Sequence, residues 1–147
     1  MVTRCHFSRL SFHRSMVGRR LPLLETATGQ AYLAFCGEAE REQIIALLAR
    51  REGPEFRLAR DPVALDNLLR KVRHRGYAEN FMAWNREEKI ASIAVPLWAG
   101  ERLLGCLNLV YVAKAMSIEQ AVVKYLPALQ RFAGRIDQLL SEGQEQV

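Results

Sequence analysis

Apolar residues recur along the chain at two spacings, and these spacings predict most of its secondary structure. Helical spacing and small side chains predict one helix over 26–35 and a second over 38–50. The clearest helix lies between Asp61 and Gly76, because an aspartate followed by proline starts helices well and glycine commonly ends them. The Gly-Pro pair at 53–54 predicts a loop before it.

Short alternating or continuous apolar runs predict the strands. We expect strands at 6–12, 17–23, 77–81, 90–97 and 103–112. A hairpin connection through Gly100 joins the last two. Both of these strands are apolar on both faces, which predicts a sheet that is covered on each side.

The chain ends in a long predicted helix that begins at Ser117 with a capping box. Its apolar residues alternate four and three apart through three heptads, at Ile118, Val122, Tyr125, Leu129, Phe132, Ile136 and Leu139. Pro127 falls opposite this seam and predicts a bend in the helix. We expect the seam to pack on the domain's own sheet; packing against the helix of a second copy is the alternative.

Length and composition predict one globular domain. The chain has 147 residues, of which 50% are hydrophobic, enough for a core of its own. No apolar run approaches the ~20 residues of a membrane span, and no apolar segment follows the basic start as in a secretory signal. Three widely spaced cysteines, an odd number, argue against a disulfide framework. A cytoplasmic location without membrane contact is the expectation.

The charge of the chain is basic and unevenly distributed. The net charge is +5, and five arginines without any acidic residue precede residue 21. A basic segment can contact nucleic acid, but the chain has no zinc-finger spacing, no helix-turn-helix pattern and no aromatic RNA-binding motif. We favour a charged, exposed sheet edge, and a small basic nucleic-acid-binding domain remains an alternative.

Neither a catalytic centre nor a cofactor or metal site is predicted. The sequence lacks a serine nucleophile elbow, a phosphate loop and paired carboxylates in an apolar frame, so we do not expect an enzyme. Cys5, His6 and His13 lack the paired spacing of metal ligands.

Two polar residues interrupt the apolar strands. Asn108 and, on the neighbouring strand, Ser92 should be buried there, and a buried amide or hydroxyl must form a hydrogen bond. Their partners are either backbone groups of a nearby loop or a polar group of a bound small molecule. Gly29 in the first helix poses a similar choice between tight packing, which we favour, and the approach of a ligand.

Three segments, in order, resemble a known family. They are residues 21–34, which contain Leu-Pro and then Thr-Ala-Thr-Gly-Gln-Ala-Tyr-Leu-Ala, residues 75–78, Arg-Gly-Tyr-Ala, and residues 92–97, Ser-Ile-Ala-Val-Pro-Leu. This set resembles the C-terminal effector-binding half of IclR-family bacterial transcriptional regulators, and the resemblance covers about residues 10–140.

The resemblance implies a fold and a function. The fold would be α/β (α+β), a GAF-like or profilin-like domain whose twisted, mostly antiparallel sheet carries helices on both faces. Residues 1–147 would form one effector-binding domain that also oligomerises, as a homodimer or tetramer. DNA would be bound only through an N-terminal winged-helix domain that this chain lacks. A free-standing GAF-like sensor of small molecules is the alternative.

The resemblance also implies the residues of an effector site and its ligand. Matched position by position, the site residues are Leu10, Leu21, Ala27, Thr28, Asn80, Ser92, Asn108 and Val110. Asn80 stands where the family commonly has an acid, and the loop at 81–89 is longer than usual and carries Met82 and Trp84 as candidate lid residues. We therefore expect a small organic carboxylate, aromatic ones included, with Arg9 or Arg14 as the candidate charge partner.

Overall fold

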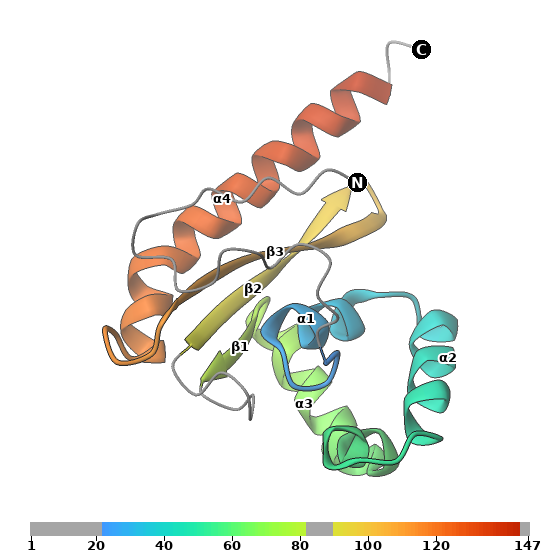
Figure 1. Cartoon of the computed structure of the whole chain (residues 1–147). Coiled ribbons are helices and arrows are strands. Elements are labelled where there is room, and N and C mark those ends of the chain that lie inside the picture. The colour runs from blue at the N-terminus through green and yellow to red at the C-terminus, as the bar shows by residue number, and fades with distance from the viewer. Residues whose placement is uncertain (1–21, 82–89, 145–147) are drawn as a thin grey trace, which may run out of the picture.

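The computed structural model describes residues 22–81 and 90–144 of the chain (Figure 1). In chain order its elements are α1 (Ala27–Phe35), α2 (Glu38–Ala49), the 3₁₀ helix η1 (Pro54–Arg60), α3 (Pro62–Arg75), β1 (Ala78–Phe81), β2 (Ile90–Ala99), β3 (Arg102–Val112) and α4 (Ile118–Gln144). All the helices and strands predicted within these ranges occur within a few residues of their expected bounds. η1 occupies the predicted loop after Gly53, while the predicted strand at 6–12 and most of that at 17–23 lie outside the described residues.

The three described strands form one antiparallel sheet in the order β1-β2-β3. Helix α1 packs on one face of this sheet, and α4 runs along the other (Figure 1). In the central strand β2 the consecutive residues Ile93 and Ala94 are both fully buried, so both of its faces are covered. The expected antiparallel sheet between helices is therefore confirmed.

The outer strand β3 is less covered than the sequence predicts. Asn108, Val110 and Val112 are all exposed on it within the described part of the chain. The prediction of a sheet covered on each side thus holds for β2 and is wrong for β3. The physical reason is position, because β3 is the outer described strand: α1 is spread over all three strands on one face, and α4 lies mainly over β2 on the other.

Helix α1 begins at a tight turn that requires the glycine of its first turn. Thr26, where the predicted helix begins, is the N-cap, and its hydroxyl accepts the N–H of Gly29 at 3.2 Å while donating to the carbonyl oxygen of Pro22 at 3.0 Å. A Cβ on Gly29 would lie 2.0 Å from the carbonyl oxygen of Leu23. Close packing of the turn at 22–26 therefore explains this glycine.

Helix α3 has both of the ends that its sequence specifies. The Asp61 carboxylate accepts the N–H of Ala64 at 3.0 Å, and Pro62 is the first helical residue. Gly76 ends the helix in the left-handed conformation, with φ 77°. The buried side of α3, which includes Leu65 and Leu69, packs against α1.

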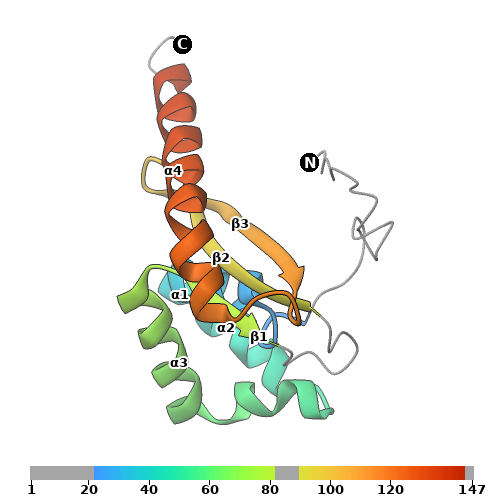
Figure 2. The ribbon, with the colours of Figure 1, turned by 90° about the vertical axis from the view of Figure 1, so that its left-hand side faces the viewer.

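Helix α4 begins at the predicted capping box, in which Ser117 and Gln120 exchange hydrogen bonds of 3.0 and 3.3 Å. It stays helical across Pro127. Phe132 is 65% exposed and Leu139 56%, so the expectation that the whole seam packs on the domain's own sheet is wrong for these two residues. The helix is longer than the sheet that it covers, and its C-terminal end projects past the β2–β3 hairpin (Figure 2).

None of the helices formed by residues 22–81 and 90–144 is both long enough and apolar enough to cross a membrane.

Candidate functional site

Strand pairing brings four of the predicted site residues together. Asn80 on β1 lies opposite Ser92 on β2, and Ser92 lies opposite Val110 on β3. In the next row Ala94 of β2 lies opposite Asn108 of β3. Residues opposite each other in a sheet point to the same face, and so do residues two apart along one strand. Asn80, Ser92, Asn108 and Val110 therefore share one face of the sheet.

This shared face is the one that α1 covers. Ala78 and Ala94 belong to the same row as Asn108, and they pack in one buried cluster with Ala27 and Ala31 of α1. The exposed fraction of Ala27, Ala31 and Ala94 is zero. Because these side chains are small, the start of α1 lies close to the strands. The predicted residues of α1 and of the sheet thus belong to one region.

Two backbone N–H groups at the start of α1 lack a partner in the described part of the chain. The N–H of Gly29 is bonded to the Thr26 side chain, and that of Gln30 to the Thr26 carbonyl at 2.9 Å. Within the described ranges the N–H groups of Ala27 and Thr28 have no hydrogen-bond partner. N–H groups of a helix's first turn attract anions, because the helix dipole is positive at this end.

The predicted site residues differ in how far their side chains are exposed. The side chain of Ala27 is buried, Thr28, Asn80 and Ser92 are half-buried, and Asn108 and Val110 are exposed. The sequence-based expectation that Asn108 is buried is therefore wrong, since β3 is the outermost described strand. In the part of the chain that the structure describes, the side chains of Asn108 and Ser92 form no hydrogen bond to protein atoms.

The remaining predicted residues belong to the parts of the chain outside 22–81 and 90–144. Leu10 and Leu21, the candidate charge partners Arg9 and Arg14, and the candidate lid residues Met82 and Trp84 lie outside the described residues, as do Cys5, His6 and His13. Among the residues that are described, no three histidine, cysteine or acidic side chains are grouped as a metal site would require.

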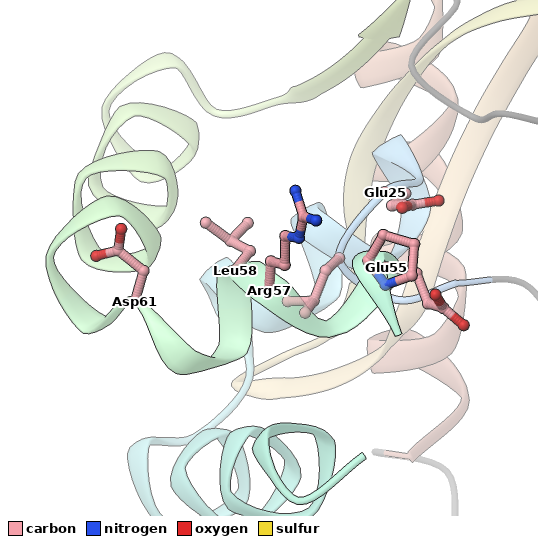
Figure 3. Close-up of a pocket in the computed structure, with 7 residues that line it drawn as sticks. Glu25, Glu55, Arg57, Leu58 and Asp61 are labelled. Atoms are coloured by element: carbon pink, nitrogen blue, oxygen red, sulfur yellow. The ribbon is translucent and has the colours of Figure 1, made fainter. Parts of the chain in front are cut away.

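Two hollows lie apart from the predicted residues. One, of about 320 Å³, separates the turn before α1 from η1 and is lined by Leu24, Glu25, Pro54, Glu55, Arg57, Leu58 and Asp61 (Figure 3). The Glu25 and Glu55 carboxyl groups lie on one side of it, and burial, followed by the charge of Glu55, raises the pKa of Glu25. Sequence reasoning missed this hollow because η1 was expected to be a loop.

The second hollow, of about 280 Å³, lies between α4 and the end of β2, on the other face of the sheet. Its lining includes Val95, Trp98 and Ala133. Neither hollow is lined by a predicted effector-site residue, so neither is a substitute for the region between α1 and the strands.

Taken together, these features define a class of protein. The fold is a GAF-like α/β arrangement, in which a small antiparallel sheet has the capped start of α1 over one face and the long helix α4 over the other. Polar side chains lie on the face beneath the start of α1. Residues 1–138 match the family model of the bacterial transcriptional regulator IclR C-terminal domain. The chain therefore belongs to this family, as the three sequence segments indicated.

Individual relatives agree with this assignment. The HTH-type transcriptional regulator XynR of Escherichia coli (strain K12) is 33% identical over 106 residues, which are 65% of this chain and 37% of that protein. The structure of an IclR family transcriptional regulator from Brucella abortus has 27% identity and a TM-score of 0.69, over 87% of this chain and 48% of that one. These relatives are transcriptional regulators and not enzymes.

A third relative was solved with a ligand. It is an IclR homolog from Microbacterium hydrocarbonoxydans complexed with 4-hydroxybenzoate, with 26% identity and a TM-score of 0.66 over 87% of this chain and 50% of that chain. The present chain thus spans between about a third and a half of the length of these relatives.

Proposed function

We propose that this chain is the effector-binding and oligomerisation domain of an IclR-type transcriptional regulator and that it binds a small organic carboxylate. Residues 1–147 form this domain, and a winged-helix domain elsewhere in the regulator binds DNA. The observation that carries the proposal is the register of the sheet, which aligns Asn80, Ser92, Asn108 and Val110 on the face that α1 covers. Allosteric control then requires that the ligand bind one arrangement of the assembly better than another.

The proposed site has a chemistry that suits a carboxylate. The Ala27 and Thr28 N–H groups at the start of α1 are donors for the anion. The Ser92 hydroxyl and the Asn108 amide can bond a second polar group of the ligand, and Val110 offers apolar contact. Asn80 in place of an acid leaves out a negative charge that would repel the ligand. The 4-hydroxybenzoate complex of a relative makes aromatic hydroxy acids the first class to test.

The first experiment measures binding of 4-hydroxybenzoate to the 147-residue chain by calorimetry and thermal shift. The uncharged 4-hydroxybenzamide is the matched ligand, since it keeps the ring and the hydroxyl but removes the carboxylate. We expect the acid to bind and to raise the melting temperature, and the amide to bind more weakly. Non-aromatic keto acids and sugar acids complete the panel. If no acid in this panel binds, the proposal of a carboxylate effector fails.

The second experiment asks which residues form the site. Asn108→Leu removes an exposed amide on the proposed face, and Asn67→Leu removes one on α3 as the control. The loss of one hydrogen bond of about 1 kcal/mol should weaken binding about fivefold in Asn108→Leu. Binding by Asn67→Leu should equal that of the parent chain. If the two variants bind alike, Asn108 is not part of the site.

A further inference from the structure

The C-terminal half of α4 carries an apolar stripe that faces away from the domain. Its members are Phe132, Ile136, Leu139 and Leu140, and their spacing of four, three and one places them on one side of a helix. Phe132 is 65% exposed, Leu139 56% and Leu140 39%. Large apolar side chains grouped in this way on a surface mark a site of association.

The stripe begins beside the sheet and continues past the end of the sheet. The N–H of Gly100, at the tip of the β2–β3 hairpin, donates to the Asp137 carboxylate at 2.8 Å and ties the tip to α4. Beyond this point the helix projects away from the sheet (Figure 2). Ala133 is buried against the domain, whereas the neighbouring Phe132 is not. The stripe therefore runs beside the contact with the sheet rather than within it.

Charged residues along one edge of the stripe indicate what covers it. Spacings of four and seven place Arg131, Arg135 and Glu142 on one edge of the stripe, and all three are exposed. They form no ion pair with any residue in the described ranges. This edge is basic toward the N-terminus of the helix and acidic toward its C-terminus. Its charges therefore complement those of the same edge on a second helix that runs in the opposite direction.

We propose that this stripe is a contact between two copies of the chain, in which the C-terminal halves of two α4 helices pack antiparallel. A two-fold axis near residues 136 and 137 places Arg131 opposite Glu142 of the partner subunit, twice, while the stripes cover each other. In parallel packing this edge would instead face the opposite edge of the partner helix, so Arg131 and Glu142 would not be paired. The inference rests on the oligomerisation part of the proposed function and specifies the surface that performs it.

The size of the stripe sets the strength of the contact. A stable interface usually buries about 800 Å² on each partner, and four side chains of one helix supply less than this. We therefore expect weak self-association of the 147-residue chain, with a Kd in about the micromolar range. In a longer regulator a second contact would raise the effective concentration and strengthen the pairing.

The test is sedimentation velocity of the 147-residue chain over about two decades of concentration around the micromolar range. Phe132→Glu should weaken the dimer by about tenfold or more, because the largest apolar side chain of the stripe, covered in the dimer, is replaced by a charge. Val123→Glu is the matched control, since Val123 is 80% exposed on the opposite side of α4. It should sediment as the parent chain does, and circular dichroism checks that each variant is folded.

A charge exchange tests the antiparallel direction. Arg131→Glu alone and Glu142→Arg alone should each weaken the dimer, and the double exchange should restore it. A chain that stays monomeric throughout, or equal effects of Phe132→Glu and Val123→Glu, would overturn the proposed surface. Failure of the double exchange would overturn the antiparallel pairing. The thermal shift with 4-hydroxybenzoate is measured on the same variants, so that loss of the dimer with binding retained is distinguished from failure of the effector site.

Discussion

Replacement of Gly29 by alanine should destabilise this fold, although alanine is the better helix former. A Cβ at position 29 would lie 2.0 Å from the carbonyl oxygen of Leu23 and 2.6 Å from its Cα and carbonyl carbon. All three are backbone atoms, so no side-chain rotation relieves the overlap. The turn at 22–26 must move by about 1 Å or more to reach an ordinary contact distance.

The size of the effect follows from three contributions. Alanine in place of glycine favours the helix by about 1 kcal/mol. Against this, overpacking in a buried site costs about 1–3 kcal/mol. Movement of the turn also strains the two bonds from Thr26 to the Pro22 carbonyl, of 3.0 and 3.2 Å, and loss of an N-cap costs about 0.5–2 kcal/mol. The net loss is about 2 kcal/mol, or a fall of about 4–8 °C in Tm for a chain of this length.

Urea unfolding followed by circular dichroism and tryptophan fluorescence measures this loss. Gly134→Ala is the matched control, because Gly134 also lies within a helix but nothing stands within 4 Å of the position of its Cβ. This control should gain about 0.5–1 kcal/mol. The reasoning is refuted if Gly29→Ala is as stable as the parent chain or gains stability as Gly134→Ala does.

Two other predictions concern a helix cap and a titrating group. Asp61→Ala should cost about 1 kcal/mol in urea unfolding, because the Ala64 N–H loses its acceptor, whereas Asp66→Ala at an exposed ion pair should cost less. The hydrogen bond of 2.5 Å to Glu40, followed by burial, raises the pKa of Tyr32 to about 12 from 10.0. The native state then keeps a proton that the unfolded chain loses, so stability should fall as pH rises from 10 to about 12. In Glu40→Gln the tyrosinate absorbance should show a lower pKa for Tyr32, and an unchanged titration would contradict this cause.

Helices whose ends carry typical capping residues could be predicted from the sequence. Asp61 and Gly76 bound α3, and Thr26 and Ser117 start α1 and α4, all as expected. Caps are local, because they depend on the side chain and on backbone groups three or four residues away. The exposure of β3 and of Phe132 could not be predicted in this way, since it depends on how far the covering helices extend in space.

The candidate site shows the same division. Alternation along a strand indicates that Asn108 and Val110 share a face, but only the pairing of separate strands aligns them with Asn80 and Ser92. Register is a long-range property that no short window of sequence contains. The burial of Asn108 was inferred from its apolar neighbours, and this inference failed because those neighbours are themselves only half-buried on an outer strand.

The Thr26 hydroxyl forms two hydrogen bonds, and this has a consequence for the rate at which a ligand would bind. The turn before α1 and the first turn of that helix are joined through this one atom, which restrains each of them relative to the other. A molecule that reaches the Ala27 and Thr28 N–H groups meets donors whose directions were fixed when the chain folded. Binding of such a molecule costs the protein little conformational entropy, which favours fast association. Differences in affinity among ligands should then lie mainly in their dissociation rates.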